Sequence, residues 1–150
     1  MEVKKILLAS ILWISGLASA HDEGHGPKLA DTGKYGGIVS AVVLKADAKK
    51  GTKAELVHKA ELVRSTDGLM RVYLYDANMK PLELKGFEAK GTASLGAKVK
   101  GKWKDVPFNL ELKGSNFEGK MPKPEGKPYN IDVTLKQEGK ELLSAFDNLD

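Results

Sequence analysis

Apolar residues recur at every second position in several stretches of this 150-residue chain. Clear cases are Ala93, Leu95, Ala97 and Val99, then Val106, Phe108, Leu110 and Leu112, then Ile131, Val133 and Leu135. Because successive side chains of a strand point to opposite faces, alternation of this kind puts one face in a core and the other in water. This pattern is typical of antiparallel sheet, so the chain is expected to be all-β.

Turn signals divide the chain into about eight predicted strands, a spacing typical of sandwiches and barrels. The strongest signal is Asp67-Gly68, because glycine supplies the positive φ that tight hairpins need. The predicted strands lie near 37–46, 54–66, 69–76, 91–100, 106–113, 116–121, 129–137 and 140–147. We expect an immunoglobulin-like antiparallel β-sandwich of about seven to eight strands, with a small open β-barrel as the second choice.

The first twenty residues have the three parts of a secretory signal peptide. Lys4 and Lys5 form a basic start, an apolar run covers 6–17, and Ala18-Ser19-Ala20 matches a cleavage site. The apolar run is shorter than the about 20 residues that a membrane-spanning helix needs. We therefore expect cleavage after Ala20, no membrane span afterwards, and export to a periplasm; an uncleaved anchor is the alternative.

The rest of the chain reads as an arm followed by one domain. Residues 21–35 lack any apolar period and are expected to form a flexible, histidine-containing arm or a loop that docks late. Residues 36–150 are expected to form a single β-domain. The net charge is +4, cleavage would lower it by one, and charges of both signs alternate, so no nucleic-acid partner is predicted.

Histidine placement suggests a metal site at the start of the cleaved chain. His21 would then offer its free α-amine as well as its ring, and His25 follows four residues later. Asp22 or Glu23 adds an oxygen donor, which gives a set suited to copper or zinc. His58, in a predicted strand, is either a third ligand or a partly buried structural histidine satisfied by the backbone. A polar arm without specific metal binding is the alternative to the whole site.

Catalytic motifs are not evident in the sequence, and we expect a protein that is not an enzyme. There is no cysteine, so thiol chemistry and disulfides are excluded. Ser–His and paired-carboxylate arrangements lack the nucleophile elbow, the glycine-rich phosphate loop or the zinc-protease motif that would mark them.

Two stretches, GKYGGIV (33–39) and HKAELVRSTDGLMRVYLYDANMKPLEL (58–84), resemble the small β-sandwich of periplasmic heavy-metal efflux adaptor proteins and their stand-alone relatives. The resemblance extends to residues 129–146. It implies a periplasmic role in copper or zinc homeostasis, with a metal-efflux component as partner. The chain departs from the pattern at Tyr35, where the family has a histidine before the double glycine, and it lacks the helical hairpin of a full adaptor.

A second likeness is chemical only. Periplasmic copper carriers and lytic polysaccharide monooxygenases are β-sandwiches whose cleaved chains begin with a copper-binding histidine, as this one would with His21. The leading hypothesis is a non-enzymatic protein that binds or buffers a divalent transition metal. The hypothesis from another class is an envelope module that binds protein through its sheet faces and has no specific metal site.

Overall fold

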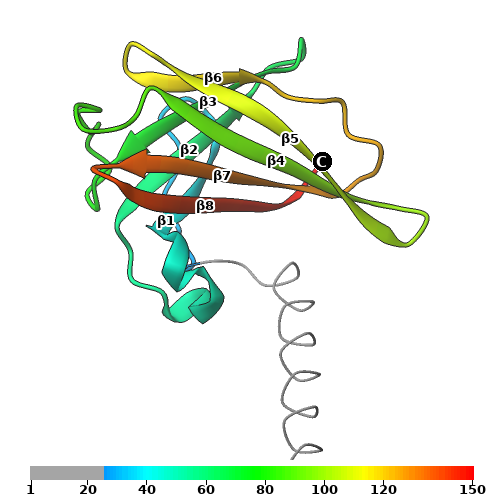
Figure 1. Ribbon diagram of the computed structural model, residues 1–150, viewed down its shortest axis with the longest axis horizontal. Coiled ribbons are helices and arrows are strands. Elements are labelled where there is room, and N and C mark those ends of the chain that lie inside the picture. Colours follow the sequence, from blue (N-terminus) through cyan, green and yellow to red (C-terminus); the bar gives the residue numbers. More distant parts are fainter. Residues whose placement is uncertain (1–25) are drawn as a thin grey trace, which may run out of the picture.

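The computed structural model describes residues 26–150, and its eight antiparallel strands close into a barrel (Figure 1). The strands are β1 (Ile38–Leu44), β2 (His58–Arg64), β3 (Leu69–Tyr75), β4 (Lys90–Val99), β5 (Lys102–Lys113), β6 (Asn116–Lys120), β7 (Tyr129–Gln137) and β8 (Lys140–Leu149). All eight predicted strands are present, and the all-β prediction is confirmed. The Asp67-Gly68 turn joins β2 to β3, with Gly68 at a φ of 88° and Asp67 Oδ1 accepting a hydrogen bond from the Leu69 N–H.

The strand order around the barrel is β1-β2-β3-β6-β5-β4-β7-β8. Most neighbours are consecutive in sequence, but β3 pairs with β6, β4 pairs with β7, and β8 returns to pair with β1. The predicted sandwich is therefore wrong, and the barrel of the second choice is correct, although it is closed. A sandwich and a barrel show the same alternation of apolar and polar residues, so the sequence pattern does not distinguish them. The barrel is closed by the pairing of β1 with β8, for example Val42 with Ser144, which are far apart in the sequence.

Inward-facing side chains fill the interior, as expected for a barrel of eight strands. The largest fully buried apolar ones are Phe117, Phe146, Leu62, Met70, Leu110 and Ile131, and all six belong to the central cluster. Gly91 of β4 allows a close approach to β7, because a Cβ there would lie 2.6 Å from Leu135 Cδ2. The interior is thus a packed core, and the surfaces that can meet a ligand lie on the outside of the barrel.

A 3-10 helical segment, η2 (Lys45–Lys53), links β1 to β2 and was not predicted from the sequence. Gly51 interrupts it with a φ of 60° and a ψ of −131°. Together with the segment before β1, it borders a small apolar cluster on the outer face of the barrel, made of Leu29, Ala41, Val43, Ala54 and Leu56. The described part of the predicted arm, residues 26–35, therefore lies against the barrel.

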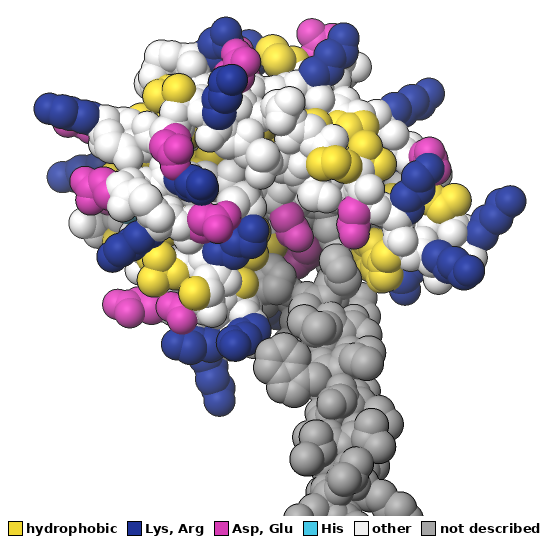
Figure 2. All heavy atoms as spheres, viewed as in Figure 1, with side chains coloured by type: hydrophobic (Ala, Val, Ile, Leu, Met, Phe, Trp, Pro, Cys, Tyr) yellow, Lys and Arg dark blue, Asp and Glu magenta, His cyan; other side chains and the backbone are white. Residues whose placement is uncertain are grey.

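Lysine and acidic side chains are mixed over the face drawn in Figure 2, as the alternation of charge in the sequence predicts. The hairpin that joins β4 to β5 extends beyond the other strands (Figure 1). Trp103 lies in β5 close to the turn of this hairpin.

Candidate functional site

The predicted ligands His21, Asp22 and His25 lie outside the described residues. The described chain starts at Gly26, whose N–H donates to the Gly51 carbonyl oxygen at 2.8 Å. A Cβ on Gly26 would lie 2.9 Å from both Ala41 Cβ and Val43 Cγ1. Gly26 is therefore packed on the outer face of β1.

His58 lies on the other side of the sheet. It shares the inward face of β2 with Ala60 and Leu62, and its ring is 5.9 Å from that of Phe87 in the core. Its Nε2 is 2.7 Å from Gln137 Oε1. Because an amide oxygen only accepts, Nε2 carries the proton in this arrangement. His58 is thus a partly buried histidine satisfied by a side chain, and the sheet separates it from Gly26.

A groove of about 540 Å³ opens beside the point where the described chain starts. One wall is the segment Gly26–Leu29, and the floor comes from the beginning of β1 and the end of β8. Trp103, Asn130 and Asp147 border the groove at its far side. These three residues come from β5, β7 and β8, which are brought together only by the strand order of the barrel.

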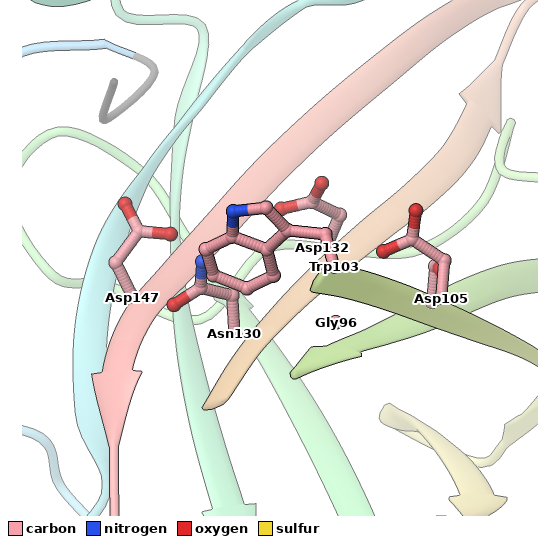
Figure 3. Close-up of a pocket in the computed structure, with 7 residues that line it drawn as sticks. Gly96, Trp103, Asp105, Asn130, Asp132 and Asp147 are labelled. Carbon is pink, nitrogen blue, oxygen red and sulfur yellow. The ribbon is translucent and has the colours of Figure 1, made fainter. Parts of the chain in front are cut away.

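A small acidic pocket adjoins the groove through the same three residues. It has a volume of about 20 Å³, room for roughly one water-sized group. Its lining is Ser94, Gly96, Trp103, Asp105, Asn130, Asp132 and Asp147. Figure 3 shows the indole ring between Asp147 and Asn130 on one side and Asp105 on the other, with Asp132 close behind it.

The lack of a side chain at Gly96 leaves room for the Trp103 ring and the Asp105 carboxylate over β4. A Cβ at this position would lie 2.8 Å from Asp105 Oδ1 and 3.7 Å from the Trp103 ring. Lys98 Nζ lies 5.5 Å from the centroid of the same ring, a cation–π contact that places one positive charge beside the carboxylates. The pocket is therefore an acidic surface with one tryptophan at its centre.

Within residues 26–150, no group of three or more His, Asp or Glu side chains is spaced to hold a metal ion.

A second acidic group, Glu61, is buried under residues 33–37. Its two carboxylate oxygens accept four hydrogen bonds of 2.7–3.0 Å, from the N–H groups of Lys34, Tyr35 and Gly37 and from the Tyr75 hydroxyl. Gly33 and Gly37 leave no room for a Cβ, which would overlap the Glu61 side chain at the former and the Leu62 carbonyl at the latter. The GKYGGIV and ELV stretches of the sequence therefore form one structural unit.

Neighbouring contacts fasten the same segment. Lys59 Nζ is 2.8 Å from Asp31 Oδ2, and the Tyr35 ring stacks on Tyr73 at a centroid distance of 4.1 Å. Burial and then the hydrogen bond with Glu61 raise the pKa of the Tyr75 hydroxyl well above its ordinary value near 10. Tyr35 thus stacks on Tyr73 while remaining largely exposed.

Sequence reasoning missed the groove and the acidic pocket. Alternation places Trp103 and Asp105 on one face of β5, and that was the available signal. Their neighbours Asp132 and Asp147 come from β7 and β8, and the alternation of apolar residues does not predict which strands pair with each other.

Comparisons with protein-family models, with curated proteins and with solved structures found no match. Among residues 26–150, no helix has the length and apolar character to span a bilayer.

Proposed function

We propose that this chain is an exported, non-enzymatic protein that binds a divalent transition metal, copper or zinc, through the first residues of its cleaved form. The amine and ring of His21 and the ring of His25 would be the nitrogen ligands, and Asp22 an oxygen ligand. An accessory role in metal efflux, with delivery of the ion to an efflux component, is the function that the family resemblance implies.

The observation that supports this proposal is the anchoring of the chain immediately after these residues. Gly26 is fixed on β1 by a backbone hydrogen bond and by close packing, and residues 31–37 are fastened by Glu61 and Lys59. A short histidine segment attached to a fixed point loses less freedom on binding a metal than one on a long flexible tail. An open groove lies next to Gly26 on the barrel surface.

Titration with Cu(II) and Zn(II) tests the proposal on the chain that begins at His21, after mass spectrometry of the exported protein has established its first residue. We expect saturable binding of one ion. His21→Ala and His25→Ala should each weaken it by at least about tenfold, because altering even the supporting partners of metal ligands typically costs 10–100-fold.

His58→Gln is the matched histidine control, and we expect it to leave the affinity unchanged. Equal, weak binding by all four proteins would overturn the metal proposal. It would favour the other candidate, an envelope module that binds protein at the groove, whose wall and floor include Leu29 and Ile38.

A further inference from the structure

We propose that the hairpin joining β4 to β5, together with the loop that crosses beside it, binds the surface of an anionic lipid bilayer. Attraction between exposed lysines and the lipid phosphates holds the barrel at that surface, and no segment enters the bilayer core. This proposal goes beyond metal binding and is independent of it, because it uses only lysines of β4, β5 and the loop between β6 and β7.

The net charge of the described chain is concentrated in these two segments. Residues 26–150 contain 22 lysines and arginines against 17 aspartates and glutamates, a net charge of +5. The hairpin stretch 98–104 and the loop stretch 123–127 together contain six lysines and one glutamate, which is also +5. The other described residues therefore sum to zero. The six lysines are all exposed, and they are Lys98, Lys100, Lys102, Lys104, Lys123 and Lys127.

The loop lies directly against the hairpin. A Cβ on Gly126 would lie 2.6 Å from the Lys98 carbonyl oxygen and 3.9 Å from Ala97 Cβ. Lys104 Nζ is 3.0 Å from Glu125 Oε1, and this exposed contact is the one ion pair that the six lysines make within residues 26–150. Because Ala97 is buried and pairs with Lys104, the loop lies on the side of the hairpin that carries Lys104.

The two faces of the hairpin differ in charge. Side chains alternate along β5, so Lys102 and Lys104 lie on one face and Trp103 and Asp105 lie on the other. The Lys98 ammonium is over the Trp103 ring, so it belongs to the face of the acidic pocket. The basic face thus consists of the side of the hairpin that carries Lys102 and Lys104, together with the loop 123–127. This is the face that we assign to the bilayer.

Shape favours a flat partner over a small anion. The hairpin extends beyond the other strands (Figure 1), and Lys or Arg side chains project from this end of the molecule at the right of Figure 2. The lining of the groove and of the acidic pocket includes none of the six lysines. A projecting hairpin of this kind does not enclose a ligand, but it can bring several lysines to one surface together.

The chemistry of the patch favours lipid over nucleic acid. Lysine is a compact point charge, which suits the diffuse negative potential of a bilayer surface. Recognition of nucleic acid relies on the arginine fork and, for single strands, on aromatic rings that stack on bases. The two stretches contain no arginine, and their one aromatic residue, Trp103, lies on the opposite face from the basic one.

Co-sedimentation with vesicles tests the proposal on the exported protein, after mass spectrometry has established its first residue. A chelator is present throughout, so that metal binding plays no part. We expect binding to vesicles of equal parts phosphatidylglycerol and phosphatidylcholine and no binding to vesicles of phosphatidylcholine alone. High salt should abolish the binding, because it screens exposed charges.

The double variant Lys102→Gln/Lys123→Gln removes one unpaired lysine from each segment. A lysine near an anionic bilayer contributes about fivefold to affinity, so this variant should bind the mixed vesicles about 25-fold more weakly. Lys102→Arg/Lys123→Arg keeps the charge and should bind as the parent does. The matched control is Lys90→Gln/Lys136→Gln, which loses the same charge from exposed positions at the other end of β4 and β7, and its affinity should be unchanged.

Three results would overturn the proposal. The first is no preference for the mixed vesicles over phosphatidylcholine vesicles. The second is an equal loss of binding in the two glutamine double variants, which would show a response to net charge and not to this patch. The third is binding to duplex DNA or to polyglutamate without binding to the mixed vesicles, which would identify a different polyanion as the partner. Because metal is absent throughout, none of these results bears on the metal proposal.

Discussion

Two acidic regions on the outer face of the barrel differ in what covers them. Glu61 lies under residues 33–37 and is fully buried, and its oxygens accept four hydrogen bonds from the chain itself. The carboxylates around Trp103 border an open groove, and Asp105 and Asp147 are exposed. The covered region holds the segment before β1 in place, whereas the open region leaves carboxylates at the surface.

Loss of the Glu61 carboxylate should have the largest effect on stability. Glu61→Ala leaves three backbone N–H groups and the Tyr75 hydroxyl without their acceptor, and unsatisfied groups of this kind typically cost about 1–3 kcal/mol each. Some of them will find water, so we expect the free energy of unfolding to fall by about 3–5 kcal/mol, measured by urea denaturation.

Glu111→Ala is the control for this experiment, since Glu111 is an exposed glutamate on β5 paired only with exposed Lys113. We expect its effect to stay within about 0.5 kcal/mol. Similar losses in the two variants would show that the covered region does not stabilise the barrel more than its open surface does.

Tyr75→Phe should have an intermediate effect and should change the response to alkali. It removes one hydrogen bond to a charged group, worth about 1.5–3 kcal/mol. The raised pKa means that the unfolded chain releases the tyrosine proton from about pH 10 while the native chain retains it. The unfolded state then binds fewer protons, so stability is present below pH 10 and falls as the pH rises above it.

Ultraviolet titration of tyrosinate, combined with urea denaturation at pH 9 and pH 11, measures both effects. Tyr73→Phe is the control, because Tyr73 stacks on Tyr35 and is outside the Glu61 hydrogen-bond set. The loss of stability between the two pH values should be smaller in Tyr75→Phe than in Tyr73→Phe. An equal loss in both would contradict the role given to Tyr75.

The contrast between the two regions also explains which features the sequence could predict. The strands and their inward faces follow from local alternation, and the Asp67-Gly68 turn follows from local chemistry. Closure of the barrel depends on β1 meeting β8, and the acidic pocket depends on β5, β4, β7 and β8 lying side by side. These pairings join distant parts of the chain, and no local pattern encodes them.

The candidate ligands show the same limit. The histidines at 21 and 25 are visible in the sequence as residue types, but the groove beside Gly26 is formed by the strand order of the barrel. His58 shows the reverse: alternation correctly predicts that it is partly buried, but its partner is the Gln137 side chain from β7 and not the backbone.

The smallest expected effect comes from a matched pair of aspartates, one in each region. Asp31→Asn removes the negative charge that faces nearly buried Lys59 and should cost about 1–2 kcal/mol, because a neutral amide oxygen accepts the Lys59 hydrogen bond less strongly than a carboxylate does. Asp105→Asn removes one of three neighbouring carboxylates at the open pocket. The free energy of unfolding should therefore change by no more than about 0.5 kcal/mol, and a small increase is expected because repulsion between the carboxylates is reduced.

Urea denaturation of both variants at low and at high salt checks this last comparison. Salt screens exposed charges, so any increase in stability of Asp105→Asn should become smaller as salt is added. The decrease in stability of Asp31→Asn should persist, because Lys59 is nearly buried. If Asp105→Asn were as destabilising as Asp31→Asn, the acidic pocket would be part of what holds the barrel together.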